Sequence, residues 1–327
     1  MTLPPLPGVP APGAVLRLRG RELGPERTVV MAVVNRTPDS FYAPARFDDA
    51  SADAAVARAE EEGADILDIG GVRAGRGPRV SVQEELDRIV PLLRRVRTRH
   101  PDLLVSVDTW RADVARVVAD EGVDLVNDTW AGHDPQLVEV AAERGLGVVC
   151  SHTGGALPRT DPFRVAYGVG DEPADPDGAD GADVDPLAVA SRDPLDAVLR
   201  DVVATVRAAA RRAVDLGVDP ASVLVDPTHD FGKNTWHSLH LVRRTQALVV
   251  LGHPVLMAFS RKDFVGESLD LPAADRLEGT LAATAVAAWL GARVFRAHDV
   301  AATRRTLDMV ATIRGDRAPA RAVRGLA

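Results

Sequence analysis

The sequence predicts a single (β/α)8 TIM barrel, and two regularities support this prediction. Eight short runs rich in valine, isoleucine and leucine recur along the 327 residues, and longer helical patterns separate them. Runs that are apolar throughout are typical of parallel strands buried on both faces. Alternation of strands and helices predicts parallel βαβ units, and eight such units favour closure into a barrel over an open sheet.

The expected elements follow one another at regular spacing. In chain order the strands are expected at 29–34, 65–69, 103–107, 124–126, 147–150, 222–225, 254–259 and 293–295. Helical patterns cover, among others, 52–62, 82–97, 112–121, 135–144, 195–216 and 275–290. Several of these end in a glycine just before the next strand, where a left-handed residue can stop the helix. An open doubly wound sheet would need a glycine-rich turn after the first strand, and Asn35-Arg36-Thr37-Pro38 is not one.

The segments outside this rhythm are expected to lie outside the barrel. Residues 1–27 begin rich in proline and predict a flexible arm, and the barrel should cover 28–315. Residues 170–194 carry many aspartates among prolines and glycines, and they have little to bury. This pattern predicts a disordered acidic insertion on the surface, with an acidic lid as the alternative. Residues 316–327 are expected to form a C-terminal tail.

Composition excludes several classes of protein. The net charge is -8 and the pI about 5.5, which argues against nucleic-acid binding because phosphates need a basic surface. Cys150 is the single cysteine, so no internal disulfide can form and a cytoplasmic location is expected. The N-terminus lacks the basic start and apolar core of a signal peptide, and no apolar run is long enough to span a bilayer.

Polar residues end all eight expected strands, at the face where barrel enzymes place their active sites. Rare residue types gather there: the chain has three asparagines and two lysines, and two of those asparagines and one of those lysines are in this set. The residues at the strand ends are Asn35, Asp68, Asp108, Asn127, Ser151, Asp226, Lys262 and Arg296, with His298 two residues beyond the last.

The residue types predict a ligand with two chemically different ends. Asp108, Asn127 and Asp226 offer acceptors and an amide that suit a flat heterocycle with several N–H donors. Arg261, Lys262, Arg296 and His298 are expected to supply positive charge for an anion, such as a phosphate. Asn35 could bind Mg2+ through its amide oxygen, with phosphates and water completing the shell. No zinc-ligand spacing and no phosphate-binding loop of the Gly-x-x-x-x-Gly-Lys-Ser type are present.

These strand ends resemble the dihydropteroate synthase family of pterin-binding barrels from about Val29 to Gly315. The resemblance rests on the order of short motifs rather than on any one of them. They are Asn35-Arg36-Thr37-Pro38-Asp39-Ser40-Phe41, Asp65-Ile66-Leu67-Asp68-Ile69-Gly70-Gly71, Ser106-Val107-Asp108-Thr109, Val126-Asn127-Asp128, Asp226-Pro227 with Phe231-Gly232-Lys233, Ser260-Arg261-Lys262 and Arg296-Ala297-His298-Asp299.

The resemblance implies a transferase that condenses 6-hydroxymethyl-7,8-dihydropterin pyrophosphate with 4-aminobenzoate and releases pyrophosphate, in folate biosynthesis. Asp108, Asn127, Asp226 and Lys262 would hold the pterin ring. The pyrophosphate and Mg2+ would lie against Arg296, His298 and Asn35, and either Arg73 or Arg76 would replace the arginine of the family's second loop. Lys262, Arg296 and His298 would be the catalytic groups. The resemblance also implies a homodimer through the last helices.

Three loops depart from the family pattern. The first and second loops, which in the family cover the aminobenzoate, differ here: 71–78 lacks the usual Ser-Thr, and 42–45 replaces a glycine-rich end. After strand six, Thr228 and Asp230 stand where the family has glycines, and glycine permits conformations that other residues resist. The pattern resembles a divergent second actinobacterial paralogue. A catalytically inactive pterin-binding protein, or a synthase for another aromatic amine, therefore remain the alternatives.

Some of these residues also have simple structural interpretations. Asp108 could cap a helix that starts near Arg111, and Asn127 could cap a turn. Asp226 precedes a proline and could be an ordinary turn residue. His298 could be a structural partner of Asp299. The sequence assigns no role to Lys233.

Overall fold

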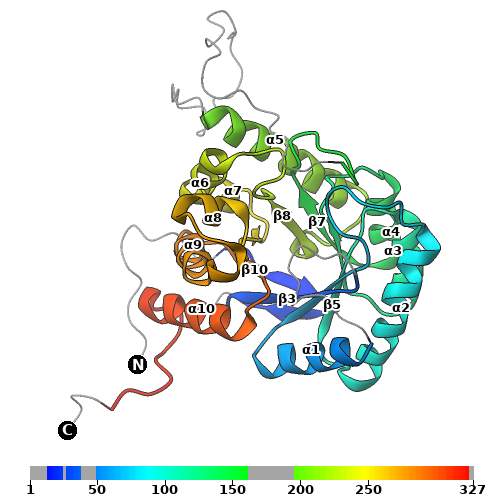
Figure 1. Ribbon diagram of the computed structural model, residues 1–327, viewed down its shortest axis with the longest axis horizontal. Helices are drawn as coiled ribbons and strands as arrows, with labels where there is room; N and C mark the ends of the chain where they lie inside the picture. The colour runs from blue at the N-terminus through cyan, green and yellow to red at the C-terminus, as the bar shows by residue number, and fades with distance from the viewer. Residues whose placement is uncertain (1–12, 25–26, 38–48, 161–194, 324–327) are drawn as a thin grey trace, which may run out of the picture.

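The computed structural model confirms the predicted barrel, and it describes residues 13–24, 27–37, 49–160 and 195–323. Eight parallel strands form one sheet in the order β8-β7-β6-β5-β4-β3-β10-β9, and helices surround it (Figure 1). A parallel bridge between Val225 and Val255 joins the two ends of this order. The sheet is therefore nearly closed, as the eight repeats predicted.

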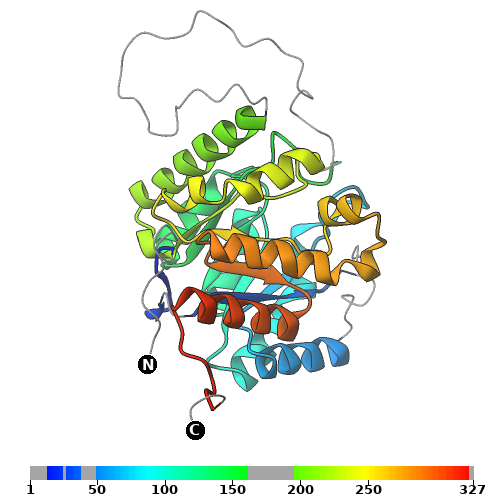
Figure 2. The ribbon, with the colours of Figure 1, turned by 90° about the vertical axis from the view of Figure 1, so that its left-hand side faces the viewer.

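The barrel strands coincide with the eight predicted apolar runs. They are β3 (Val29–Asn35), β4 (Ile66–Gly70), β5 (Leu104–Asp108), β6 (Leu125–Asp128), β7 (Gly147–Ser151), β8 (Val223–Asp226), β9 (Leu256–Met257) and β10 (Val294–Ala297). The outer layer contains α1 (Asp49–Glu61), α2 (Val82–Arg99), α3 (Ala112–Asp120), α4 (Gln136–Arg144), α5 (Leu195–Asp215), α6 (Thr235–Arg243), α7 (Gln246–Val249), α8 (Asp263–Leu269), α9 (Leu277–Trp289) and α10 (Val300–Arg314). Figure 2 shows α9 in orange and α10 in red lying side by side along the barrel wall.

The helices pack on the barrel because their apolar faces match the outward side chains of the strands. In α2, Ile89, Leu92, Leu93 and Val96 recur at helical spacing and are buried against that layer. Ser81 begins this helix, and its hydroxyl accepts the backbone N–H of Glu84. Among the described residues, no helix combines the length and apolar character that crossing a bilayer requires.

The prediction of a flexible arm over 1–27 is wrong for the part of it that the structure describes. Residues 13–24 contain an antiparallel hairpin of β1 (Leu16–Leu18) and β2 (Arg21–Leu23). Leu16 and Leu18 are fully buried against the inward side chains at the N-terminal end of the barrel. A Cβ atom on Gly147 would lie 2.6 Å from Leu18 Cδ2, so this glycine makes room for the hairpin. The hairpin adopts a defined structure because its leucines cover the apolar end of the barrel.

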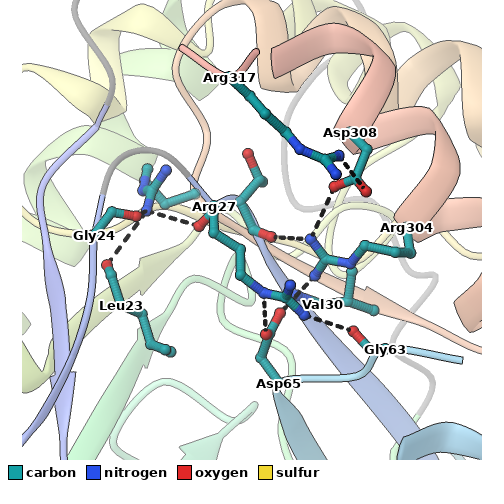
Figure 3. Close-up of polar contacts among 11 residues, drawn as sticks. Leu23, Gly24, Arg27, Val30, Gly63, Asp65, Arg304, Asp308 and Arg317 are labelled. Carbon is teal, nitrogen blue, oxygen red and sulfur yellow. Dashed lines mark hydrogen bonds and ion pairs between the residues drawn. The ribbon is translucent and has the colours of Figure 1, made fainter. Parts of the chain in front are cut away.

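A polar cluster around Asp65 ties this end of the chain to α10 (Figure 3). The Asp65 carboxylate accepts hydrogen bonds from Arg27 Nε at 2.6 Å, from Arg304 at 2.5 Å and from the backbone of Val30 at 2.9 Å. Arg304 also donates to the carbonyl of Thr28 and lies 3.6 Å from Asp308. The carboxylate is nearly buried, so these ion pairs are shielded from solvent and hold the start of β4 against α10.

The remaining domain expectations fall partly outside the described residues. The proline-rich start at 1–12 and the acidic insertion at 170–194 lie outside them, and so does the end of the tail. Residues 318–323 are exposed and form neither helix nor strand.

We expect Leu16→Ala to lower the free energy of unfolding by about 2–5 kcal/mol, because it removes a buried side chain and leaves a cavity under the barrel. Urea denaturation followed by circular dichroism measures the change. Leu157→Ala is the matched control, since Leu157 is 55% exposed and its truncation should change stability by under about 0.5 kcal/mol. Equal small losses in both variants would contradict the assignment of the hairpin as a plug.

Candidate functional site

Alternation along the strands builds the candidate site in the barrel interior. Successive side chains point to opposite faces of a strand, so Ile66 and Asp68 share the inner face of β4, and Leu104 and Ser106 share that of β5. The inward layer at the N-terminal end is apolar. The layers above it are polar, and they comprise Asp68, Ser106, Asp108, Asn127, Ser151, Asp226 and Arg296. The interior therefore changes from a packed core to a polar cavity toward the C-terminal ends of the strands.

Arg296 stands at the centre of the polar layers. Its Nε donates to Asp68 Oδ2 at 2.6 Å, and one terminal nitrogen donates to Asp108 Oδ2 at 3.1 Å. Asn127 Nδ2 donates to the same Asp68 oxygen at 3.3 Å, and the Thr129 hydroxyl donates to Asp108 Oδ1 at 3.1 Å. The network thus links β10, β4, β5 and β6 across the mouth of the barrel.

Burial sets the protonation of this network. Burial raises the pKa of Asp108 to about 7, with Arg296 opposing the rise and Asp68 adding to it. Burial also acts to lower the pKa of the Arg296 guanidinium, but Asp68 and Asp108 outweigh it and the pKa is raised. Arg296 is therefore a permanent cation, whereas Asp108 can gain or lose a proton near neutral pH.

A second group of residues comes from the loop after β8 and the turn after β9. Lys262 Nζ donates to the carbonyl of His229 at 2.6 Å and lies 5.4 Å from the centre of the Phe231 ring. Burial lowers the pKa of Lys262, and Asp230 and Asp226 counteract this. Asp226 Oδ1 accepts the backbone N–H of Thr228 at 2.7 Å. The loop thereby fixes the position of the lysine beside two carboxylates.

Lys233 supports this loop from below. Its ammonium is buried and donates to the carbonyls of His152, Thr228 and Phe231 at 3.0, 3.2 and 2.8 Å. All three N–H donors are therefore used by the backbone. Burial lowers the pKa of Lys233 to about 7. Lys233 is absent from the cavity lining, so the structure gives it a role in shaping the loop.

The two groups face one cavity of about 550 Å³, a size that suits a small organic ligand. All nine site residues expected from the sequence line this cavity. They are Asn35, Arg73, Arg76, Asp108, Asn127, Asp226, Lys262, Arg296 and His298. The structure thus brings together every predicted position, from six different strand ends and from the loop after β4.

The structure corrects the expected source of positive charge. Burial, with Arg296 beside it, lowers the pKa of His298 to about 4, so this imidazole is neutral at neutral pH. The Arg261 guanidinium forms two hydrogen bonds with Asp299, at 3.0 and 3.1 Å, and is held by the carbonyls of Ala273 and Ala274. Asp299 is therefore the partner of Arg261 rather than of His298. Arg261 also lines the cavity, but its charge is paired with Asp299, and the other cations of the lining are Lys262, Arg296, Arg73 and Arg76.

The simple structural interpretations of Asp108 and Asn127 are not supported. Asp134, rather than Asp108, accepts the N–H of Ala112 at the start of α3, at 2.8 Å. Asn127 donates to Asp68 across the barrel. The sequence analysis counted Asp68 among the polar strand ends but gave it no role in the site, although it lies one inward position below Gly70. The signal was its alternation with Ile66 on β4, which puts it on the inner face.

The loop of residues 71–80, called here the arginine-held loop, forms one wall of the cavity. Arg159 donates to the carbonyls of Arg73 and Pro78 at 2.6 and 2.7 Å. Arg111 donates to the carbonyl of Val80 at 2.6 Å, and Arg88 donates to that of Gly71 at 2.8 Å. Four carbonyls of one loop are thus bound by three guanidinium groups, which fixes the loop although it contains no helix or strand.

The Asn35 amide oxygen is the candidate ligand for a metal ion. Asn35 lines the cavity, and a Cβ atom on Gly70 would lie 2.9 Å from its Oδ1, so a glycine at position 70 makes room for this oxygen. Within the described ranges, no group of three or more histidine, cysteine or acidic residues is placed to hold a metal. The site therefore fits Mg2+ that takes most of its ligands from phosphate and water.

Known proteins share this fold and sequence pattern. The model of a family described as pterin binding enzymes matches residues 31–298. A Mycobacterium leprae protein named inactive dihydropteroate synthase 2 is 54% identical over 311 residues, covering 95% of this chain and 99% of its own. The dihydropteroate synthase of Bacillus subtilis is 33% identical over 280 residues, covering 84% and 85%. A Coxiella burnetii dihydropteroate synthase solved with pteroic acid superimposes with a TM-score of 0.75 at 29% identity, covering 92% and 98%.

We expect Arg159→Ala to release the arginine-held loop and to speed tryptic cleavage after Arg73, Arg76 or Arg79 by about 10- to 100-fold. Two charged hydrogen bonds are lost while Arg88 and Arg111 still hold the ends of the loop, so opening becomes easier by about 1.5–3 kcal/mol in all, and cleavage follows the population of the opened loop. Mass spectrometry of timed digests identifies the cut sites. Arg144→Ala, which removes an exposed arginine on α4, is the control. Unchanged cleavage rates would show that Arg159 does not hold the loop.

Proposed function

The chain belongs to the pterin-binding enzyme family, and we propose that it acts as a transferase of the dihydropteroate synthase type. The donor substrate would be 6-hydroxymethyl-7,8-dihydropterin pyrophosphate, and the acceptor 4-aminobenzoate or another aromatic amine. One observation carries this proposal: Asp108, Asn127, Asp226, Lys262 and Arg296 come from five different strand ends and line one cavity. The Coxiella burnetii relative with the same fold was solved with pteroic acid.

The two ends of the cavity suit the two ends of the donor. Asp108, Asn127 and Asp226 would accept and donate hydrogen bonds at the edge of the pterin ring, and Lys262 would donate to it. Arg296 Nη1 has no partner among the described residues and would bind the diphosphate, together with the neutral His298 imidazole. Arg73 and Arg76 line the same cavity, and neither guanidinium contacts another described residue. They would add positive charge where the leaving group departs.

The reaction needs no side-chain nucleophile. The C–O bond between the pterin methylene and the diphosphate breaks, and its electron pair leaves with the diphosphate. The amine nitrogen then donates its lone pair to the methylene carbon, and the proton that it loses passes to water. Arg296, Arg73 and Arg76 would stabilise the charge that develops on the leaving group, and the cavity would hold the two reactants in contact. Bound Mg2+, held by Asn35 and the phosphates, would supply further charge neutralisation.

Two further properties are proposed with this function. Val286 on α9 and Met309 and Ile313 on α10 are apolar and between 47% and 58% exposed, which supports a homodimer formed through these adjacent helices. A cytoplasmic location fits a chain whose only cysteine, Cys150, is buried and free.

A second candidate function is pterin binding without catalysis. The Mycobacterium leprae relative favours this candidate, because that relative is named an inactive dihydropteroate synthase. In that case the purified protein would bind the pterin but would release no pyrophosphate with any amine.

We expect the purified protein to release pyrophosphate from the pterin donor when Mg2+ and an aromatic amine are present, and Lys262→Met to slow this release by about 100-fold or more. The variant removes a cation that borders the ring site. A coupled phosphate assay measures the rate. Arg116→Met, a change at an exposed arginine on α3, should leave the rate unaltered. Donor binding without pyrophosphate release would select the second candidate function.

We expect pterin affinity to fall as the pH drops below about 7. Burial raises the pKa of Asp108 to about 7, and a protonated carboxyl can no longer accept N–H donors on both oxygens. Below this pKa, the association constant should decrease by up to about tenfold per pH unit. Calorimetry between pH 5.5 and 8.5 on wild type and Asp108→Asn measures it, and the comparison removes the ligand's own titration. Parallel profiles for the two proteins would refute the role of Asp108.

A further inference from the structure

Two carboxylates line the cavity on the side of Lys262, and the reaction described above does not use them. Asp230 lies in the loop after β8, and Asp263 is the first residue of α8. Another part of the lining is the arginine-held loop, which carries Arg73 and Arg76. The lining around Lys262 therefore holds carboxylates as well as cations, whereas the only charged groups that the arginine-held loop contributes are cations.

Asp230 occupies its position at a cost in backbone energy. Its φ angle is +71°, in the left-handed region that favours glycine, and the resembling family has a glycine at this place. Thr228 and Gly232 in the same loop have φ angles of +49° and +63°. The backbone of the loop thus adopts the conformation that glycines favour, although Asp230 carries a side chain.

The contacts of the Asp230 side chain explain how this conformation is maintained. Oδ2 accepts the backbone N–H groups of Asp263 at 2.8 Å and of Phe264 at 3.4 Å, and Oδ1 accepts the Ser238 hydroxyl at 3.1 Å. The backbone N–H of Asp230 in turn donates to the Ser238 oxygen at 3.2 Å. The carboxylate is buried, and it already accepts the two backbone N–H groups at the start of α8.

Asp263 adds a second negative charge nearer to the solvent. Its side chain is 40% exposed, and one oxygen is bound by Arg276 at 2.7 Å. Phe231 lies in the same part of the lining, with its ring 5.4 Å from Lys262 Nζ. Phe231, Asp230 and Asp263 line the same cavity, so an aromatic acceptor bound against Phe231 would have the two carboxylates in its surroundings.

We propose that Asp230 and Asp263 determine the acceptor specificity, so that the cavity accepts an aromatic amine with an uncharged far end and rejects one that ends in a carboxylate. This inference rests on the proposed function, because it concerns the acceptor of that reaction. A substrate carboxylate would meet two like charges at short range in a partly buried place, where screening by water is weak. The backbone N–H groups of Asp263 and Phe264 could not bind that carboxylate, because they already donate to Asp230.

The test compares 4-aminobenzamide with 4-aminobenzoate, which differ at the far end in charge and little in shape. Calorimetry measures the binding of each to the full-length protein, both alone and with 6-hydroxymethylpterin and pyrophosphate present. We expect wild type to bind the amide at least tenfold more tightly than the benzoate. Asp230→Asn and Asp263→Asn each remove a charge and keep an oxygen acceptor, which for Asp263 can still accept from Arg276. Each should reduce the preference several-fold.

Asp275→Asn is the matched control, because it removes one negative charge from an exposed position that does not line the cavity. It should leave the preference unchanged. Equal or tighter binding of 4-aminobenzoate by wild type, binding of neither acceptor, or a preference that both cavity variants retain would overturn the inference. If the amide is preferred but no amine supports pyrophosphate release, the acceptor specificity stands and the transferase proposal fails.

Discussion

The ion pairs between Arg296 and the carboxylates of Asp68 and Asp108 are the interaction on which the candidate site depends. Arg296 projects from β10 and reaches past β3 to two strands on its other side. Removing Arg296, or removing its carboxylate partners, would leave a buried charge uncompensated, at a cost of about 3–5 kcal/mol. The cavity therefore keeps its shape only while these charges remain balanced, which couples the stability of the strand ends to their ability to bind a polar ligand.

Balanced charge also explains how the protein can keep so many acidic groups in one place. Asp108 and Asp226 line a single cavity, Asp68 is buried beside them against Arg296, and burial raises the pKa of Asp108 and of Asp226. Arg296 and Lys262 oppose the rise, so the carboxylates remain usable as acceptors. A heterocycle that brings its own N–H donors would replace part of this internal pairing.

The loop after β8 shows how the same scaffold can carry an altered specificity. Lys233 binds two carbonyl groups of this loop and that of His152 after β7, and Thr228 and Asp230 adopt left-handed conformations that glycine would adopt at lower cost. The backbone course, and with it the position of Lys262, is thereby preserved. What changes is the lining, because Asp230 places a carboxylate where a glycine would place none. The arginine-held loop, which also lines the cavity, is likewise fixed by Arg88, Arg111 and Arg159 rather than by regular structure.

The sequence by itself determined the eight strands and the polar residues at their ends, because both are local properties of short runs. All nine predicted site residues line one cavity for this reason: the C-terminal ends of parallel strands meet at one face of a barrel. The tertiary structure alone decided which charges pair. Arg296 and Asp68 are 228 positions apart, and only closure of the barrel makes them neighbours. Closure also left an apolar end to be covered, which ordered the hairpin of Leu16 and Leu18. Burial made His298 neutral, and the contacts of Asp230 with α8 follow from packing that no local pattern encodes.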